Sequence, residues 1–221
     1  MSDKEWFTVA TTTTNSVEGS TFDVFINTTP ICPNMTNAQF RKRVMTARDG
    51  ALKLVNGRII LLSTVWSREK VRVQTYFGST SEEVRAELLR GLSALCGVLE
   101  RLEPSNFIRP DPETERVLGC VPNPNQQSGT LAHVCGPDTA THTIAIHEAF
   151  CSLRDETFSS KESMQSTIIH ECTHFYDTFA SIVYQNIYYG KHQAQKLARL
   201  EPAMAIKNAD NITWYIVSTD D

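Results

Sequence analysis

The chain has 221 residues, of which 41% are hydrophobic and 21% are charged, and its formal net charge is -4. These proportions are typical of a globular protein that can bury a sizeable core. The small negative charge argues against a broad basic surface for nucleic acid or an anionic membrane. No apolar stretch reaches the roughly 18 residues that a membrane-spanning helix needs. We therefore expect neither a nucleic-acid nor a membrane partner; the composition leaves the oligomeric state open.

The beginning of the chain and its cysteines bear on the cellular compartment. Met1–Phe7 lacks the basic and then apolar order of a signal peptide, so we expect either a specialised secretion route or a cytoplasmic location. No two of the six cysteines form a CxxC pair, which argues against a structural zinc site made of four cysteines. Cys96 and Cys172 fall on apolar positions of predicted helices and are expected to be buried free thiols. We expect one or two disulfides among the four cysteines in loop-like surroundings: Cys32, Cys120, Cys135 and Cys151.

The first third of the chain divides into a polar lead-in and a helical segment. Residues 1–30 are rich in threonine, and we expect them to precede a single domain that covers 31–221. The apolar run Phe22–Ile26 predicts an edge strand or a loose extension. Apolar residues at three- and four-residue spacing predict a helix from a Thr36 cap to about Val55, where Asn-Gly would end it.

Two strands and a second helix are predicted next. Arg58–Trp66 and Val71–Phe77 are rich in β-branched and aromatic residues, and we expect them to pair as strands. Ser79 or Ser81 then begins a helix. Its expected buried face consists of residues at helical spacing: Val84, Leu88, Leu92, Leu95 and Leu99.

A loop, a strand and a third helix complete the predicted frame. Pro104–Gln127 contains five prolines and is expected to be mostly loop, and Thr141–Ile146 alternates as a strand does. Ser159–Glu162 fits a capping box, so a helix is expected from about Lys161. Its apolar stripe would run through Met164, Ile168, Cys172, Phe175 and Phe179.

The run His170-Glu-Cys-Thr-His174 lies on this predicted helix and matches the HExxH pattern. Two histidines one helical turn apart can both reach one zinc ion, about 2.0–2.1 Å from each nitrogen. Glu171 lies beside them and could take a proton from a metal-activated water and later deliver it to the leaving amine. The pattern predicts a Zn²⁺-dependent peptidase that acts on peptides or proteins.

Several segments after His174 add to this pattern. Tyr188-Tyr-Gly190, a helix-like run and Asn208-Ala-Asp-Asn211 follow in that order, and together with HExxH they resemble the aspzincins, the family of deuterolysin and lysine-specific metalloendopeptidases. The resemblance covers about His133–Trp214. It implies an α+β, zincin-like fold with a helical N-terminal half and a small edge sheet beside the HExxH helix.

The resemblance also implies roles for individual residues. His170 and His174 would be zinc ligands and Glu171 the general base. Tyr189 would stabilise the developing oxyanion, and Asp210 would line a pocket for a basic, lysine-like side chain at the cleavage site.

The chain departs from the family pattern at the third zinc ligand and in the pocket. The family's aspartate corresponds to Asn186, whose amide oxygen is a weaker donor. Asp177 is an alternative ligand, because His170, His174 and Asp177 would share one face of a continuing helix. Asp177 could equally orient an imidazole, or water could complete the site. In the pocket, Thr213 stands where the lysine-specific branch has a glutamate.

These departures leave a second function open, a catalytically degenerate zincin-like module that binds a peptide or a partner without cleaving it. Four further histidines could suggest a second metal site, but we expect each to be a surface or hydrogen-bonded residue: His133, His142, His147 and His192.

Overall fold

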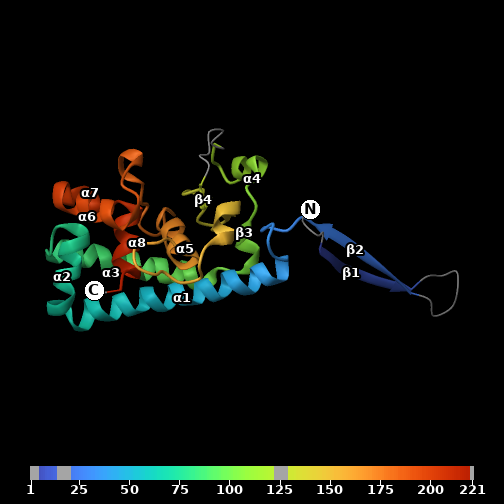
Figure 1. Cartoon of the computed structure of the whole chain (residues 1–221), viewed down its shortest axis with the longest axis horizontal. Coiled ribbons are helices and arrows are strands. Elements are labelled where there is room, and N and C mark those ends of the chain that lie inside the picture. Colours follow the sequence, from blue (N-terminus) through green and yellow to red (C-terminus); the bar gives the residue numbers. More distant parts are fainter. Residues whose placement is uncertain (1–4, 14–20, 122–128, 220–221) are drawn as a thin grey trace.

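The computed structural model describes residues 5–13, 21–121 and 129–219; for the strands within 5–28 it describes the backbone only. The predicted loop at 122–127 and parts of the predicted lead-in lie outside the described residues. The helices and strands, in chain order (Figure 1), are β1 Glu5–Thr13, β2 Thr21–Thr28, α1 Asn37–Thr64, α2 Trp66–Phe77, α3 Glu82–Arg101, β3 Phe107–Ile108, α4 Pro112–Val117, β4 Ala132–Val134, β5 Ile144–Ile146, α5 Met164–Thr173, α6 Gly190–Leu200, α7 Pro202–Ala205 and α8 Ala209–Val217.

The N-terminal segment forms an antiparallel hairpin rather than a loose lead-in. β1 and β2 pair from Glu5 opposite Thr28 to Thr13 opposite Thr21, with a shift in register after Thr8. Figure 1 shows this hairpin projecting away from the helical body. The apolar run that predicted an edge strand therefore lies within β2.

The first long helix begins where the sequence predicted but ends later. Thr36 caps α1: its hydroxyl accepts from the Gln39 amide, and the Gln39 side chain accepts from the Thr36 amide. The helix continues through Gly57 to Thr64, so the predicted end at Asn56-Gly57 is wrong. The buried stripe that includes Val55 resumes seven residues later at Leu62, and burial of this face outweighs the cost of glycine in a helix.

The two strands predicted over Arg58–Trp66 and Val71–Phe77 are also wrong, because both segments are helical. Val73, Tyr76 and Phe77 are buried on one face of α2, a spacing that a helix provides and a strand does not. Local β-propensity is weak and is overridden by this packing.

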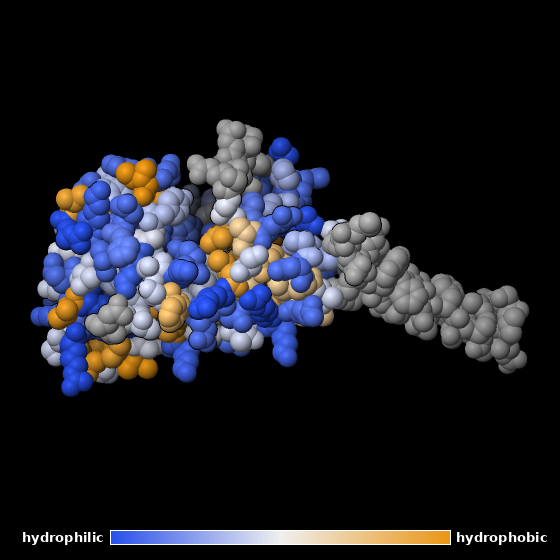
Figure 2. Space-filling model, in the orientation of Figure 1, coloured by the Kyte–Doolittle hydropathy of each residue, from blue (hydrophilic) through white to orange (hydrophobic). Residues whose placement is uncertain are grey.

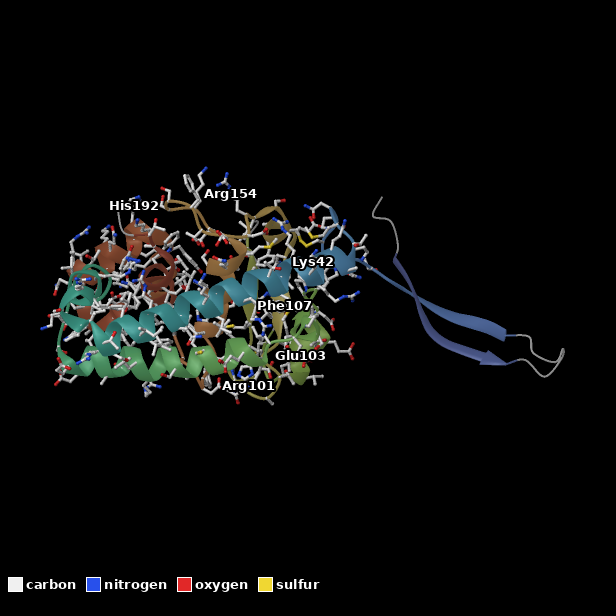
Figure 3. The ribbon with its side chains drawn as sticks, turned by 90° about the horizontal axis from the view of Figure 1, so that it is seen from below. Lys42, Arg101, Glu103, Phe107, Arg154 and His192 are labelled. Atoms are coloured by element: carbon white, nitrogen blue, oxygen red, sulfur yellow. A yellow bond between two sulfur atoms is a disulfide. The ribbon has the colours of Figure 1, made fainter. Side chains whose placement is uncertain are left out.

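The second predicted helix is confirmed as α3. The Ser81 hydroxyl accepts from the Val84 amide at the start of the helix. Four of the five predicted core positions are fully buried: Leu88, Leu92, Leu95 and Leu99. Seen from below, α1 and α3 lie side by side along the body (Figure 3).

A three-stranded sheet in the order β3-β5-β4 lies beside the HExxH helix. β5 is parallel to β3 and antiparallel to β4, and all three of its residues are buried. The predicted strand is shorter at its beginning, because His142 has a positive φ of 49° and the Asp138 carboxylate accepts from the Thr141 and Thr143 amides. In Figure 1, α5 lies between this sheet and helices α6 to α8.

The HExxH helix is shorter than predicted at both ends. Its N-cap is Ser163, which exchanges hydrogen bonds with Ser166, and not Ser159, which has a positive φ of 59°. The helix ends at Thr173, where Ser181 donates its amide to the Thr173 carbonyl at 3.0 Å. The predicted helical stripe therefore ends at Cys172.

Within the described residues the predicted disulfides and free thiols are confirmed, but Cys96 is only partly buried, whereas burial was predicted for it as well as for Cys172. Disulfides join Cys32 to Cys151 and Cys120 to Cys135, while Cys96 and Cys172 are free. The face shown in Figure 2 is mostly hydrophilic, with small hydrophobic areas among the hydrophilic ones. No helix in the described part of the chain is both long and apolar enough to cross a membrane.

Candidate metal centre and active site

The two histidines of the HExxH run lie together, and each has an oxygen atom near its Nδ1. The ring centroids of His170 and His174 are 4.9 Å apart. The Nδ1 of His174 is 2.8 Å from the Ser181 carbonyl oxygen, and the Nδ1 of His170 is 3.4 Å from Oδ2 of Asp210. A partner at Nδ1 places the proton there and leaves the Nε2 lone pair for a metal.

Burial keeps both imidazoles neutral near pH 7. It lowers the pKa of His170 to about 4, and burial together with the charge of His170 lowers the pKa of His174 to about 4. Neutral imidazole is the form that binds zinc. The metal would therefore not have to displace a proton from either ligand.

Asp210 lies in the first turn of α8, is 2% exposed and faces the back of His170. Its Oδ1 accepts from the Gly190 amide at 2.7 Å and from the Trp214 indole at 3.2 Å. Its Oδ2 has no hydrogen-bond partner among the described residues, because the 3.4 Å contact with His170 lacks hydrogen-bond geometry. This unpaired oxygen behind an imidazole fits a metal site, in which carboxylates commonly orient histidine ligands.

Glu171 is 6% exposed and lies next to His170 in α5. Burial, and then the charge of Asp210, raises the pKa of Glu171 to about 8. A carboxyl group with a raised pKa is a stronger base once it has lost its proton, as a general base requires. A nearby cation would favour its ionised form.

Tyr189 is the N-cap residue of α6 and is 56% exposed. Its ring stacks on that of His170, with the centroids 6.4 Å apart and the planes at 16°. The structure thus brings together four of the predicted residues around His170: Glu171, His174, Tyr189 and Asp210.

The two predicted candidates for the third ligand, Asp177 and Asn186, have different surroundings. Because α5 ends at Thr173, Asp177 does not share a helical face with His170, so the geometric basis of that prediction is wrong. The Asp177 carboxylate instead contacts Nε2 of His142 at 3.0 Å. Asn186 is exposed in a short turn with a positive φ of 54°. Among the described residues, no three His, Cys, Asp or Glu side chains are arranged to hold a metal ion.

The predicted pocket residue Thr213 is 1% exposed and lies one turn after Asp210. Its hydroxyl has no hydrogen-bond partner among the described residues. Glu162, which sequence reasoning assigned only to a helix cap, lies before the Ser163 cap of α5 and accepts at Oε2 from the Ser166 hydroxyl at 2.9 Å.

The four remaining histidines are hydrogen-bonded or exposed, as expected. His133 bonds to His147 at 2.8 Å and to Glu115 at 2.9 Å, so it is a hydrogen-bonded residue of the sheet edge. His142 is bonded to Asp177, as described above. His192 is exposed on α6 and is labelled in Figure 3.

Comparison with known proteins identifies the family. Residues 63–217, well over half of the chain, match the aspzincin family model, described as lysine-specific metallo-endopeptidase. The chain belongs to the aspzincin family. Membership confirms the predicted metallo-endopeptidase activity on peptide bonds.

A solved structure shares the fold of this aspzincin. The structure, described as a zinc peptidase from Grifola frondosa, superposes with a TM-score of 0.60 at 21% sequence identity. The match covers 80% of this chain and 94% of the Grifola frondosa chain. This likeness confirms the predicted α+β fold with its helical N-terminal half and small sheet. No curated protein sequence matches the chain.

Proposed function

We propose that this aspzincin is a zinc-dependent endopeptidase in which His170 and His174 hold the metal through Nε2. The observation that carries the proposal is the arrangement of the two Nδ1 atoms, each within 3.4 Å of a buried oxygen. Bound zinc would supply a Lewis acid that lowers the pKa of a coordinated water toward 7.

The surrounding residues then have distinct roles. Glu171 would accept the proton of the attacking water at its carboxylate and pass it to the leaving amine. Tyr189 is the exposed member of the site, and its hydroxyl would donate a hydrogen bond to the developing oxyanion of the substrate. Asp210 would accept the Nδ1 proton of His170 and thereby hold that ring in its ligating orientation.

The third ligand is a choice among three groups. Asp177 would have to leave His142 to reach the metal, Asn186 would ligate through its amide oxygen from an exposed turn, and water is the third choice. Each choice makes a different prediction for metal content, and this difference separates them experimentally.

The substrate is a peptide or protein chain, with a preference for basic, lysine-like residues at the cleavage site. Asp210 lies beside His170, and Thr213 follows it by three residues on α8; both side chains are buried. The preference rests on the carboxylate, because a buried ammonium needs an opposite charge and acceptors for its protons.

Zinc content and Glu171-dependent hydrolysis test the proposal together. Purified protein should contain one equivalent of zinc, and Glu171→Gln should retain the metal and the fold while peptide cleavage falls at least about 100-fold. Glu156→Gln, an exposed acid in the same region, is the matched control and should cleave at the wild-type rate.

Two variants identify the third ligand by the same elemental analysis. Loss of zinc in Asp177→Ala or in Asn186→Ala alone would name it, and retention in both would point to water. Wild-type protein that binds no zinc even when zinc is supplied would refute the proposal. It would leave the second candidate function, a degenerate module that binds a peptide or a partner. This function is favoured by one observation: the described residues contain no group of three His, Cys, Asp or Glu side chains that could hold a metal ion.

A further inference from the structure

The loop that leads into Tyr189 depends on other segments for its shape. Gln185 and Asn186 have φ angles of 52° and 54°, in a region that residues with a Cβ atom rarely adopt. Both side chains, and that of Ile187 after them, are exposed, so packing against the core does not hold this part of the loop. The position of Tyr189 therefore rests on the contacts that hold the two ends of the loop.

Asn208, the N-cap residue of α8, joins both ends of this loop, and its side chain is fully buried. Its Oδ1 accepts from the Tyr184 amide at 2.9 Å, and its Nδ2 donates to the Tyr188 carbonyl at 3.2 Å. A parallel β-bridge between Ile182 and Asn208 extends the same contact along the backbone. One amide side chain thus closes the loop at the residue immediately before Tyr189.

Tyr189 is held on both sides by the start of α8. Asn208 donates to the carbonyl of the residue before it, and Asp210 Oδ1 accepts from the amide of the residue after it, Gly190, at 2.7 Å. Between these two anchors the ring of Tyr189 stacks on that of His170 and is 56% exposed. The backbone on either side is therefore fixed, while the side chain stays open to a substrate.

The position of Asn208 requires an amide. Its Nδ2 also donates to Oδ1 of Asn211 at 2.7 Å. Asn211 cannot reverse its own amide, because its Nδ2 donates to the carbonyls of Tyr76 and Ala194 at 2.5 and 2.8 Å. Asn208 must therefore supply one acceptor and two donors, which an amide provides. An aspartate would keep the acceptor but would place a carboxylate oxygen against the Tyr188 carbonyl and the Asn211 oxygen.

We propose that Asn208 is a positioning residue for peptide hydrolysis, which holds Tyr189 where its hydroxyl reaches the oxyanion of the substrate. The inference rests on the proposed function of Tyr189. It gives a role to a residue that the sequence showed only as part of the Asn-Ala-Asp-Asn run. Because the oxyanion forms only in the transition state, loss of Asn208 should lower kcat and leave KM nearly unchanged.

A double-mutant cycle separates this role from general support of the fold. Tyr189→Phe should lower kcat about 100-fold, the usual loss when one oxyanion donor is removed. Asn208→Asp should lower kcat at least about tenfold, with KM within about threefold of wild type. In the Tyr189→Phe background it should lower kcat by less than about twofold, because the hydroxyl that it positions is already absent.

Asn211→Asp is the matched control, since Asn211 is equally buried and lies in the first turn of the same helix. It removes the donations to carbonyls of α2 and α6 but keeps the oxygen that accepts from Asn208. It should therefore lower the free energy of unfolding while kcat stays within about threefold. Asn208→Ser, uncharged and too short to span the loop, serves as a second variant if the buried charge of Asn208→Asp prevents folding; urea unfolding checks each protein.

Fluorine NMR of the metal-free protein gives a measurement that is independent of catalysis. The chain has six tyrosines, so incorporation of 3-fluorotyrosine gives six signals, and the one missing in Tyr189→Phe belongs to Tyr189. Asn208→Asp and Asn208→Ser should shift or broaden this signal, because the ring no longer keeps its place on His170. Asn211→Asp should leave it unchanged.

Two outcomes would overturn the proposal. One is a loss of kcat in Asn208→Asp that is as large in the Tyr189→Phe background as in the wild type, as general destabilisation would produce. The other is a Tyr189 fluorine signal that is unchanged in both Asn208 variants. Full activity of Tyr189→Phe would refute the oxyanion role in the proposed function, and with it the catalytic consequence of positioning, whereas the fluorine signal reports the place of the ring in either case.

Discussion

Replacing Asp210 by asparagine tests whether this carboxylate orients a zinc ligand. The amide oxygen of asparagine can keep the hydrogen bonds from the Gly190 amide and the Trp214 indole. Its amide nitrogen would then replace Oδ2, which lies 3.4 Å from Nδ1 of His170. Two donors would face each other there, and the tautomer that leaves Nε2 free for the metal would lose its acceptor.

The expected loss in zinc affinity is about 10–100-fold, the usual effect of removing a partner of a ligating histidine. That range corresponds to about 1.4–2.7 kcal/mol. The metal-free protein should change much less in stability, because asparagine has nearly the same volume and removes a buried charge.

Zinc affinity is measured by competition with a chromophoric chelator, and the stability of the metal-free protein by urea unfolding. Asp138→Asn is the matched control, because Asp138 is also buried, at 5% exposed, but accepts from the amides of the 138–143 turn. A zinc affinity within twofold of wild type in Asp210→Asn would refute the orienting role, as would an equal loss in Asp138→Asn.

Further predictions concern the fold and its pH dependence. Gly78 ends α2 at a φ of 66°, and an added Cβ would lie 2.0 Å from a backbone oxygen of α6, so Gly78→Ala should lower the free energy of unfolding by about 2–4 kcal/mol. Gly57→Ala meets no atom within 4 Å inside α1 and should be neutral or stabilising by up to about 1 kcal/mol; urea unfolding of both variants checks the contrast. The pKa of Glu162 rises from 4.5 to about 7 on folding, so its ionisation should destabilise the metal-free protein progressively between pH 4.5 and 7 by up to about 3 kcal/mol. Glu162→Gln should flatten this decline of the unfolding free energy with pH. A decline as steep as that of the wild type would contradict the raised pKa of Glu162. Replacing Cys32 and Cys151 by serine opens a link across 119 residues and should cost about 2–5 kcal/mol, measured by thermal unfolding.

The amino-acid sequence by itself determined the features that depend on neighbouring residues. Three local patterns are examples: the Thr36 and Ser81 caps, the leucine stripe of α3, and two histidines one turn apart with a glutamate between them. Helical spacing fixes which of these residues share a face, and cap chemistry fixes where a helix begins. The order of HExxH, Tyr-Gly and Asn-Ala-Asp-Asn likewise required no knowledge of the fold.

Tertiary structure decided the secondary structure of segments in which local preferences compete. Arg58–Phe77 is rich in strand-forming residues, yet it is helical because burial of one helical face outweighs a weak local preference. The HExxH helix ends at Thr173 because the side chain of Thr178 and the amide of Ser181 bond to its last carbonyls, and this removes Asp177 from the histidine face.

Contacts between distant segments were also beyond the sequence. Asp210 follows His170 by 40 residues, and only the packing of α8 on α5 brings its carboxylate to within 3.4 Å of Nδ1 of this imidazole. Burial and charge shift pKa values only after the chain has assembled the site. The sequence therefore predicted the HExxH metal site of this aspzincin, and the fold placed the Asp210 carboxylate beside one of its histidines.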